Sequence, residues 1–214
     1  MLWVMLCAGV LVGGGAIAVA QQLLFAMNEA SLRTRLSHWT YAVGAVTGGI
    51  TGWSIHRSSQ EAASALQVIV MLLFLVQAPI DLMTHRLIRP LTYLCIAITM
   101  SVEVVDVLVA DSPWGEALRD VASAVVVTLI VVGAYTVLHR LSPRSLGWGD
   151  VLLVVPLSLA VGYVHLASVA VWQLIASLTA AAYALTVRGR SGSAFIAFGP
   201  HLLFAAWLVL LVSV

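Results

Sequence analysis

The chain has 214 residues, of which 62% are hydrophobic and only 9% are charged, and its net charge is +1. Soluble domains carry about 25% charged residues, so this chain has too few charges to cover a water-facing surface. The small net charge also argues against a nucleic-acid partner. Composition therefore predicts an integral membrane protein, with the lipid bilayer as its first partner.

Apolar runs follow one another along the whole chain. A spanning helix needs roughly 20 apolar residues, and the runs cover residues 2–27, 38–56, 62–82, 90–110, 117–138, 150–164, 166–186 and 195–214. We expect an all-α, polytopic membrane helix bundle of about eight transmembrane helices. Six or seven remain open, because only the short segment from Gly162 to His165 divides the sixth run from the seventh. One membrane domain over residues 1–214, without a soluble domain, is the expected organisation.

The arginines predict how the bundle is oriented. Four pairs follow the first, third, fifth and seventh runs: Arg33 and Arg35, Arg86 and Arg89, Arg140 and Arg144, Arg188 and Arg190. In an eight-helix alternation these pairs fall on one side, and cytoplasmic loops are enriched in basic residues. That side is therefore expected to face the cytoplasm, with both chain termini on the opposite side.

Glycines in the first two runs indicate close helix packing. Gly44, Gly48 and Gly52 have the small-xxx-small spacing that lets helix backbones approach each other in lipid, and we interpret the triplet at 13–15 in the same way. Cys7 and Cys95 both stand in apolar runs, and the six histidines show no paired metal spacing. We therefore expect neither a disulfide framework nor a metal site.

Two aspartates are the strongest candidates for chemistry. Asp81 closes the third run, where a carboxylate faces the negative end of the helix dipole. It is either functional, as acids in membrane segments often are, or an interfacial acid neutralised by His85 or Arg86. Asp150 opens the sixth run and is well placed as a helix N-cap. Capping does not require the flanking glycines Gly147 and Gly149, which permit unusual backbone angles and close approach of another chain.

Both aspartates fall at the expected cytoplasmic ends of their helices. Two close carboxylates share a proton, so that one activates a water while the other polarises a carbonyl. Glu103 and Asp106 are the remaining acids within an apolar run, and we favour an interfacial position for them over a polar crevice. If they formed an ion site instead, the chain would be transporter-like. His85 and Arg86 either anchor the helix at the membrane surface, or tune Asp81 or bind a polar substrate segment, whereas Arg89 is assigned to anchoring.

Three segments in order resemble the type IV prepilin peptidases, a family of bacterial membrane aspartic peptidases related to the archaeal preflagellin peptidases. Residues 81–92 resemble the segment of the first catalytic aspartate, in which a basic pair and a proline follow the acid. Residues 147–151 resemble the Gly-x-Gly-Asp segment. Residues 197–200 resemble a late Phe-Gly-Pro segment that opens the last helix.

The resemblance implies that Asp81 and Asp150 are the catalytic pair, in an enzyme that needs no cofactor. It implies removal of a short basic leader from prepilin-like precursors, at the cytoplasmic face of the bacterial inner membrane, in pilus biogenesis or protein secretion. Residues expected to shape the site or bind substrate are Gly147, Gly149, His85, Arg86, Phe198, Gly199 and Pro200.

The chain differs from that family at a few positions. Leu152 stands where a lysine is frequent, Pro90 is shifted relative to the usual first segment, and His201 follows Pro200. The cytoplasmic zinc-binding insert of the bifunctional members is absent, so N-methylation is not part of the expectation. The alternatives are a catalytically inactive homologue and a transporter-like bundle, and a homo-oligomer is left open.

Overall fold

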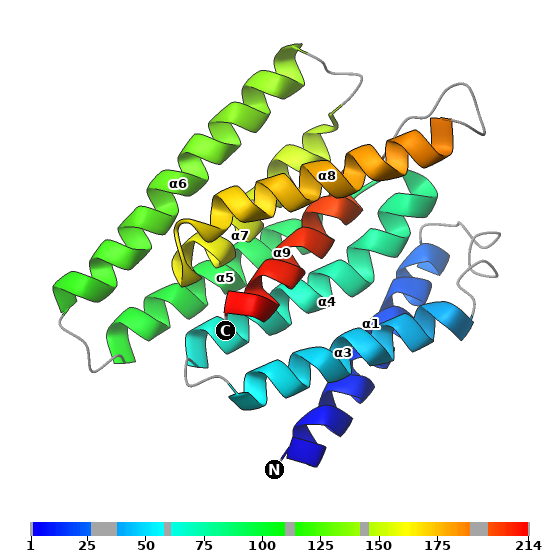
Figure 1. Ribbon diagram of the computed structural model, residues 1–214, viewed down its shortest axis with the longest axis horizontal. Coiled ribbons are helices and arrows are strands. Elements are labelled where there is room, and N and C mark those ends of the chain that lie inside the picture. The colour runs from blue at the N-terminus through cyan, green and yellow to red at the C-terminus, as the bar shows by residue number, and fades with distance from the viewer. Residues whose placement is uncertain are drawn as a thin grey trace.

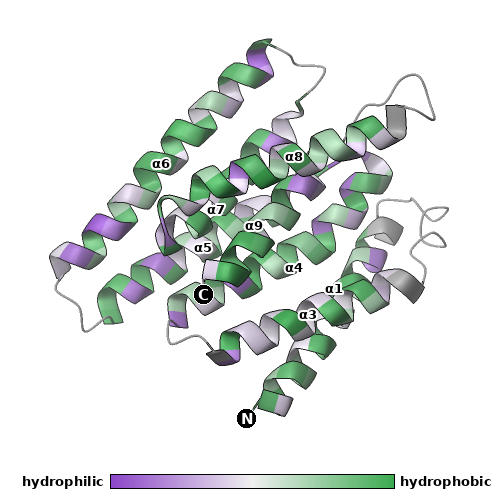
Figure 2. Cartoon of the chain, in the orientation of Figure 1, coloured by the Kyte–Doolittle hydropathy of each residue, from purple (hydrophilic) through white to green (hydrophobic). Residues whose placement is uncertain are grey.

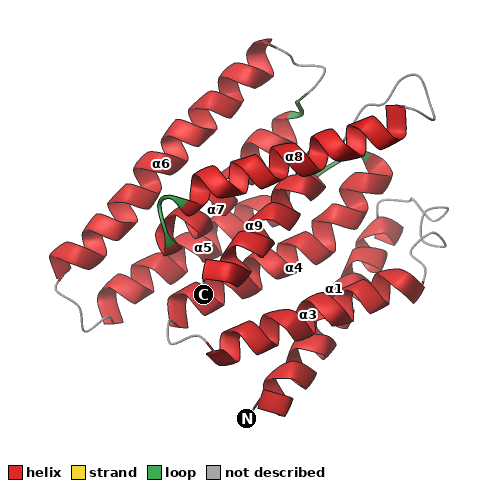
Figure 3. Ribbon diagram, viewed as in Figure 1, coloured by secondary structure: helices red, strands yellow, loops and turns green. Residues whose placement is uncertain are grey.

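The structure is a computed structural model that describes residues 2–26, 38–57, 61–109, 114–141, 146–188 and 197–213. Regular secondary structure within these residues is helical (Figures 1 and 3). The helices are α1 (Leu2–Ala26), α3 (His38–Arg57), α4 (Glu61–Thr84), α5 (Arg89–Val109), α6 (Trp114–Leu141), α7 (Trp148–Val164), α8 (Ser168–Arg188) and α9 (Gly199–Ser213). The all-α prediction is confirmed, and the division expected near Gly162 to His165 is found.

Five of these helices, α1, α4, α5, α6 and α8, are long and apolar enough to cross a membrane. Two more, α7 and α9, are apolar but shorter. Hydrophobic residues predominate along the helices (Figure 2), and large ones such as Val105, Leu129 and Leu185 are exposed. Exposed apolar surface on this scale is expected where lipid replaces water as the solvent. The chain is therefore a multi-pass membrane protein, while a total of eight spans stays a prediction.

Successive helices run in alternating directions, so their ends gather at two ends of the bundle (Figure 1). The last turns of α4, α6 and α8 and the first turns of α5, α7 and α9 lie at one end, and both termini lie toward the other. Several residues behind the orientation argument fall outside the described part: Arg33, Arg35, Arg144 and Arg190. The assignment of one end to the cytoplasm thus continues to depend on the sequence.

Helices α1 and α3 form a glycine-mediated pair. A β-carbon on Gly48 would collide with the backbone carbonyl of Gly9, and one on Gly13 would collide with that of Gly44. The packing interpretation of the α3 glycines is therefore confirmed. It holds for only one member of the triplet in α1, because Gly14 and Gly15 have open space around them.

The core of the bundle is built around α4, α7 and α9. Leu66, Leu157 and Leu202, one from each helix, are fully buried. Outer helices are attached to this core by indole hydrogen bonds: Trp172 of α8 donates to the Leu202 carbonyl at 2.9 Å, and Trp207 of α9 donates to the Thr51 hydroxyl at 3.0 Å. In an apolar solvent such bonds satisfy polar groups that have no water to turn to. They hold α8 and α3 against α9, whose first turn carries part of the candidate site.

Candidate active site

Asp81 lies in the last turn of α4, which continues to Thr84, two residues beyond the end expected at position 82. Its side chain is 5% exposed, and Oδ2 has no hydrogen-bond partner within the described residues. Pro79, two residues earlier, leaves the carbonyl of Leu75 without its helical donor. Asp81 is therefore a buried carboxyl at a locally weakened helix end.

His85 ends α4 in the left-handed conformation, with φ of 52°, and is the one non-glycine residue with positive φ in the described ranges. Its N–H donates to the Asp81 carbonyl at 2.8 Å. This is the αL termination motif, in which the residue after the cap returns a hydrogen bond to the last turn. His85 thus reverses the direction of the chain immediately after the helical turn that holds Asp81. Its side chain is exposed.

Asp150 occupies the first turn of α7, and the sequence-based N-cap assignment is wrong in detail. The N-cap is Gly147, and Asp150 is the third helical residue. Its Oδ2 accepts the backbone N–H of Gly147 at 3.1 Å, so the side chain reaches back to the cap residue. This is the reciprocal half of a capping box, and it holds the carboxyl of Asp150 at the helix entrance with 8% exposure.

Gly199, the first residue of α9, lies between the two aspartates. A β-carbon built on it would be 2.6 Å from Oδ2 of Asp81 and 3.4 Å from Oδ1 of Asp150. The backbone N–H of Gly199 donates to Asp150, and the charge of Asp81 acts on Asp150. The N-terminus of a helix favours negative charge near it, so α9 begins where two carboxyl groups meet. The aspartates, 69 positions apart by subtraction of their numbers, form one site.

The two glycines beside Trp148 have different roles from those expected. Gly147 has φ −73° and ψ 149°, which any residue adopts, and no described glycine has positive φ. The expectation of unusual backbone angles is therefore wrong. Close approach is correct for Gly149, where a β-carbon would be 3.1 Å from Cδ1 of Leu87. Gly149 lets the α4–α5 connection pack against the start of α7.

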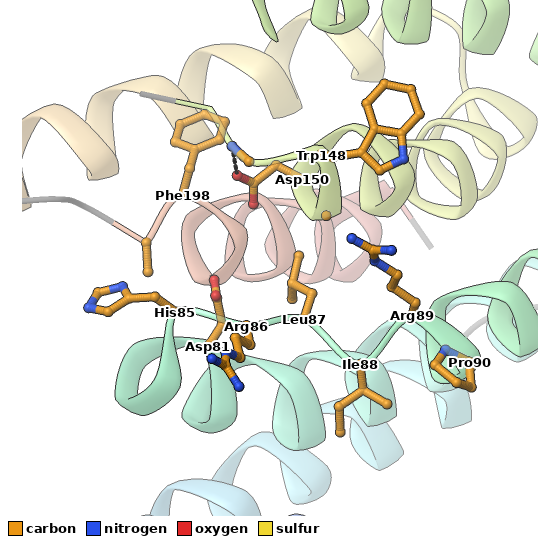
Figure 4. Close-up of a pocket in the computed structure, with 13 residues that line it drawn as sticks. Asp81, His85, Arg86, Leu87, Ile88, Arg89, Pro90, Trp148, Asp150 and Phe198 are labelled. Carbon is orange, nitrogen blue, oxygen red and sulfur yellow. Dashed lines mark hydrogen bonds between the residues drawn. The ribbon is translucent and has the colours of Figure 1, made fainter. Parts of the chain in front are cut away.

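A cavity of about 640 Å³ opens at this end of the bundle (Figure 4). In the close-up, Asp81 and Asp150 point toward one another from opposite walls, and Arg89 extends toward Trp148. The lining residues are Asp81, His85, Arg86, Leu87, Ile88, Arg89, Pro90, Gly147, Trp148, Gly149, Asp150, Ala197 and Phe198. The volume lies within the range of ligand sites, about 300–1,000 Å³.

The structure brings most of the expected site residues to this cavity. His85 and Arg86 line it, as does Phe198, whose ring lies 6.3 Å from that of Tyr135 between centroids. Pro200 is buried in the first turn of α9 and does not line the cavity. The fixed φ of Pro200 suits the first turn of a helix, and it therefore favours the start of α9 at Gly199.

Several lining residues were missed from the sequence. Arg89, assigned to anchoring, lines the cavity, as do Leu87, Ile88, Trp148 and Ala197. For Arg89 and Leu87 a signal existed, because both fall in the connection that directly follows Asp81. Trp148 lies between Gly147 and Gly149 in the sequence, but nothing in the sequence indicated that its side chain lines the cavity.

Glu103 and Asp106 lie near the far end of α5 and outside the cavity. Glu103 is 1% exposed, so it faces the interior of the bundle. Asp106 is half-buried and accepts a hydrogen bond from the Tyr163 hydroxyl of α7. An interfacial depth for this pair stays a prediction.

No three described His, Cys, Asp or Glu side chains lie together in a way that would hold a metal ion. Comparison of the chain with protein-family models, with curated proteins and with solved structures finds no match. The features that bear on function are therefore the paired carboxylates and the multi-pass membrane fold that holds them.

Proposed function

We propose that the chain is a membrane-embedded aspartic endopeptidase that removes the leader from prepilin-like precursors. The observation that carries this proposal is the convergence of Asp81 and Asp150 on Gly199. Two aspartates on separate helices that meet at a cavity can supply the general acid and the general base for hydrolysis of a peptide bond. The three ordered segments in the sequence point to the prepilin type among such peptidases.

The chemistry follows from how differently the two carboxyls are held. Asp150 accepts backbone N–H groups from Gly147 and Gly199, and such hydrogen bonds favour the ionised form. Burial favours the protonated form of both carboxyls, and Oδ2 of Asp81 has no donor within the described residues to offset it, so we assign the shared proton to Asp81. In this assignment Asp150 takes a proton from water, and Asp81 donates its proton to the scissile carbonyl oxygen as hydroxide adds to the carbon.

Breakdown of the resulting tetrahedral intermediate reverses the proton traffic. Asp150 passes its proton to the leaving amine, the C–N bond breaks, and Asp81 recovers a proton as the carbonyl reforms. The pair titrates as a unit, so a pH profile reports on both residues together.

The cavity supports a substrate that approaches with its backbone extended. Leu87 to Pro90 form one wall and Trp148 with Gly149 the other. The two walls meet where Gly149 packs against Leu87, and Arg86 and Arg89 offer donors to substrate oxygens. The arginine bias of the loops assigns this end to the cytoplasm, where a precursor in the bacterial inner membrane exposes its leader.

The second candidate is a transporter-like bundle, favoured by one observation, the burial of Glu103 far from the aspartate cavity. A homologue without activity is the third, and Leu152 in the first turns of α7 is the position that raises it. Both would leave the two aspartates without a hydrolytic role, so mutation of that pair distinguishes them from the peptidase.

The test is co-expression with prepilin-like precursors and measurement of leader removal by intact-mass analysis. The wild-type chain shortens the precursor, whereas Asp81→Asn and Asp150→Asn each lower the cleavage rate by roughly 10²–10⁴-fold, the usual contribution of an acid–base group. Asp120→Asn, the same change at an exposed position on α6, leaves cleavage unchanged.

Leader removal that persists in both single variants contradicts the proposal. Ion-coupled uptake that is lost in Glu103→Gln and retained in Asp81→Asn favours the transporter-like alternative. Unfolding temperatures of all variants, measured in the same detergent, ensure that loss of cleavage is not loss of fold.

A further inference from the structure

Helix α5 places polar side chains toward the interior of the bundle and large apolar side chains on its exposed face. Its buried residues are Thr92, Cys95, Thr99 and Glu103. They follow one another at intervals of three and four, so they form one stripe along the helix. The large apolar side chains, among them Leu94, Ile98, Met100, Val104, Val105 and Leu108, are exposed instead. A polar stripe therefore faces the interior of the bundle along about 16 Å of helix.

The stripe begins at the aspartate cavity. Thr92 accepts a hydrogen bond from Nε2 of Gln77 at 3.0 Å, which joins α5 to α4. Gln77 lies one turn before Asp81 on α4, and residues four apart share a helix face. Gln77 and Thr92 are both fully buried. A row of buried polar groups thus starts beside Asp81 and continues down α5.

Much of this row has no protein partner. Within the described residues, Oε1 of Gln77, Oγ1 of Thr99 and both carboxyl oxygens of Glu103 make no hydrogen bond to protein. An unpaired buried polar group costs several kcal/mol in a membrane, and a bare charge costs more. Glu103 can sit there if it carries a proton and if the row as a whole is hydrated.

The far end of the row leads to further acids. Tyr163 of α7 donates its hydroxyl to Asp106, and the charges of Glu103, Asp106 and Asp120 all act on Tyr163. Asp106 is half-buried and Asp120 of α6 is exposed. On α4, the acid at this end is Glu61, and it is exposed. A tyrosine–carboxyl pair therefore lies near Glu103, at the end of α5 away from the aspartate cavity.

We propose that the polar stripe of α5 lines a hydrated column in the bundle, and that Glu103 binds an exchangeable proton within it. The ligand is a proton delivered by water from the end of the bundle where Asp106, Tyr163 and Asp120 lie. This site is separate from the aspartate cavity and does not depend on the peptidase proposal.

The test uses dicyclohexylcarbodiimide, an apolar reagent that modifies protonated carboxyls, on the full-length chain in detergent. Peptide mass spectrometry maps the modified residues. Glu103 is modified at low pH, and its modification rate falls about tenfold for each pH unit above the point at which the carboxyl loses its proton. Addition of Na⁺ or K⁺ at constant pH leaves the rate unchanged. Glu103→Gln removes this modification.

Reagent access is controlled on the same helix. Met100 is exposed and lies one turn from Glu103, so the carboxyl introduced by Met100→Glu in the Glu103→Gln background is open to the reagent from the apolar side. Modification of that variant with no modification of wild-type Glu103 at any pH overturns the proposal. Protection of Glu103 by Na⁺ or K⁺ overturns it in favour of a cation site.

The double variant Asp81→Asn with Asp150→Asn distinguishes the proton site at Glu103 from the proposed peptidase site. It retains pH-dependent modification of Glu103, because α5 is unchanged. A failure of the peptidase proposal would leave this result intact, and a failure at Glu103 would leave leader cleavage intact.

Discussion

Gly199 lies so close to Asp81 that a β-carbon on it would come within 2.6 Å of Oδ2 of Asp81. The same atom would be 3.4 Å from Oδ1 of Asp150. A glycine at this position therefore sets the distance between the two carboxyls. The first residue of α9 thus lies between the two carboxyls and also donates a hydrogen bond to Asp150.

Gly199→Ala is expected to lower leader cleavage by roughly 10²-fold or more, since a displacement on the scale of 1 Å in a catalytic group has effects of that size. The added methyl must push Asp81 or α9 aside, at a cost of about 1–3 kcal/mol in the free energy of unfolding. Cleavage rates and detergent unfolding curves measure the two effects. Gly133→Ala on α6, where nothing lies within 4 Å, is the matched control and leaves cleavage unchanged.

The two glycines beside Trp148 are expected to respond differently to alanine. Gly149→Ala brings a methyl to 3.1 Å from Leu87 and lowers cleavage, because Leu87 and the α4–α5 connection must shift. Gly147→Ala is tolerated, because its backbone angles suit any residue and its nearest contact would be an ordinary 3.4 Å to Asp150.

A double-variant cycle isolates the Leu87 contact. Leu87→Ala added to Gly149→Ala restores part of the lost rate, since the two positions touch and their effects are not additive. Equal losses in Gly147→Ala and Gly149→Ala would show that flexibility of the segment, rather than contact with Leu87, accounts for the glycines.

His85 provides a test of conformation against chemistry. Its φ of 52° is costly for most side chains, so His85→Gly is expected to raise the free energy of unfolding by roughly 1 kcal/mol and His85→Val to lower it. If the residue acts mainly through the chain reversal, His85→Gly also keeps its cleavage rate. A rate that falls in His85→Gly while stability rises would assign the imidazole a direct part in the reaction.

The α1–α3 pair gives a prediction for stability alone. Gly48→Ala is expected to lower the free energy of unfolding by about 1–3 kcal/mol, because the backbones must separate to admit the methyl group. Gly14→Ala, in a helix position with open space, is neutral or stabilising by up to about 1 kcal/mol. Thermal unfolding in detergent compares the two, and equal effects would contradict backbone contact at Gly48.

The helices themselves could be predicted because lipid imposes a length and a composition on each span, and these are local properties of the sequence. The aspartate pair was reachable for a related reason. Alternation of direction puts the end of α4 and the start of α7 at the same end of the bundle, whatever the lateral packing. Which side chains complete the site was less accessible.

Lateral packing explains what the sequence did not reveal. Gly199 was expected at the site from the resemblance, but its closeness to both carboxyls follows from the packing of α9 against α4 and α7, and the order of helices around a bundle has no local signature. The direction in which Glu103 faces was hidden for the same reason. A single acid in an apolar run faces lipid or the protein interior depending on how its helix is rotated, and rotation is set by the neighbours. Arg89 was assigned to anchoring by a rule about loops that says nothing of cavities.

The polar stripe of α5 also bears on how the chain is assembled. Asp106 obtains its hydroxyl donor from Tyr163, 57 residues further along the chain. During synthesis, α5 therefore enters the membrane before α7 exists to cover its polar side. The stripe must meanwhile face α4, a translocation channel or an insertion factor. Variants that make α5 more apolar, such as Thr99→Val, should insert more readily as isolated segments, which makes insertion efficiency a cost that this helix bears for its interior.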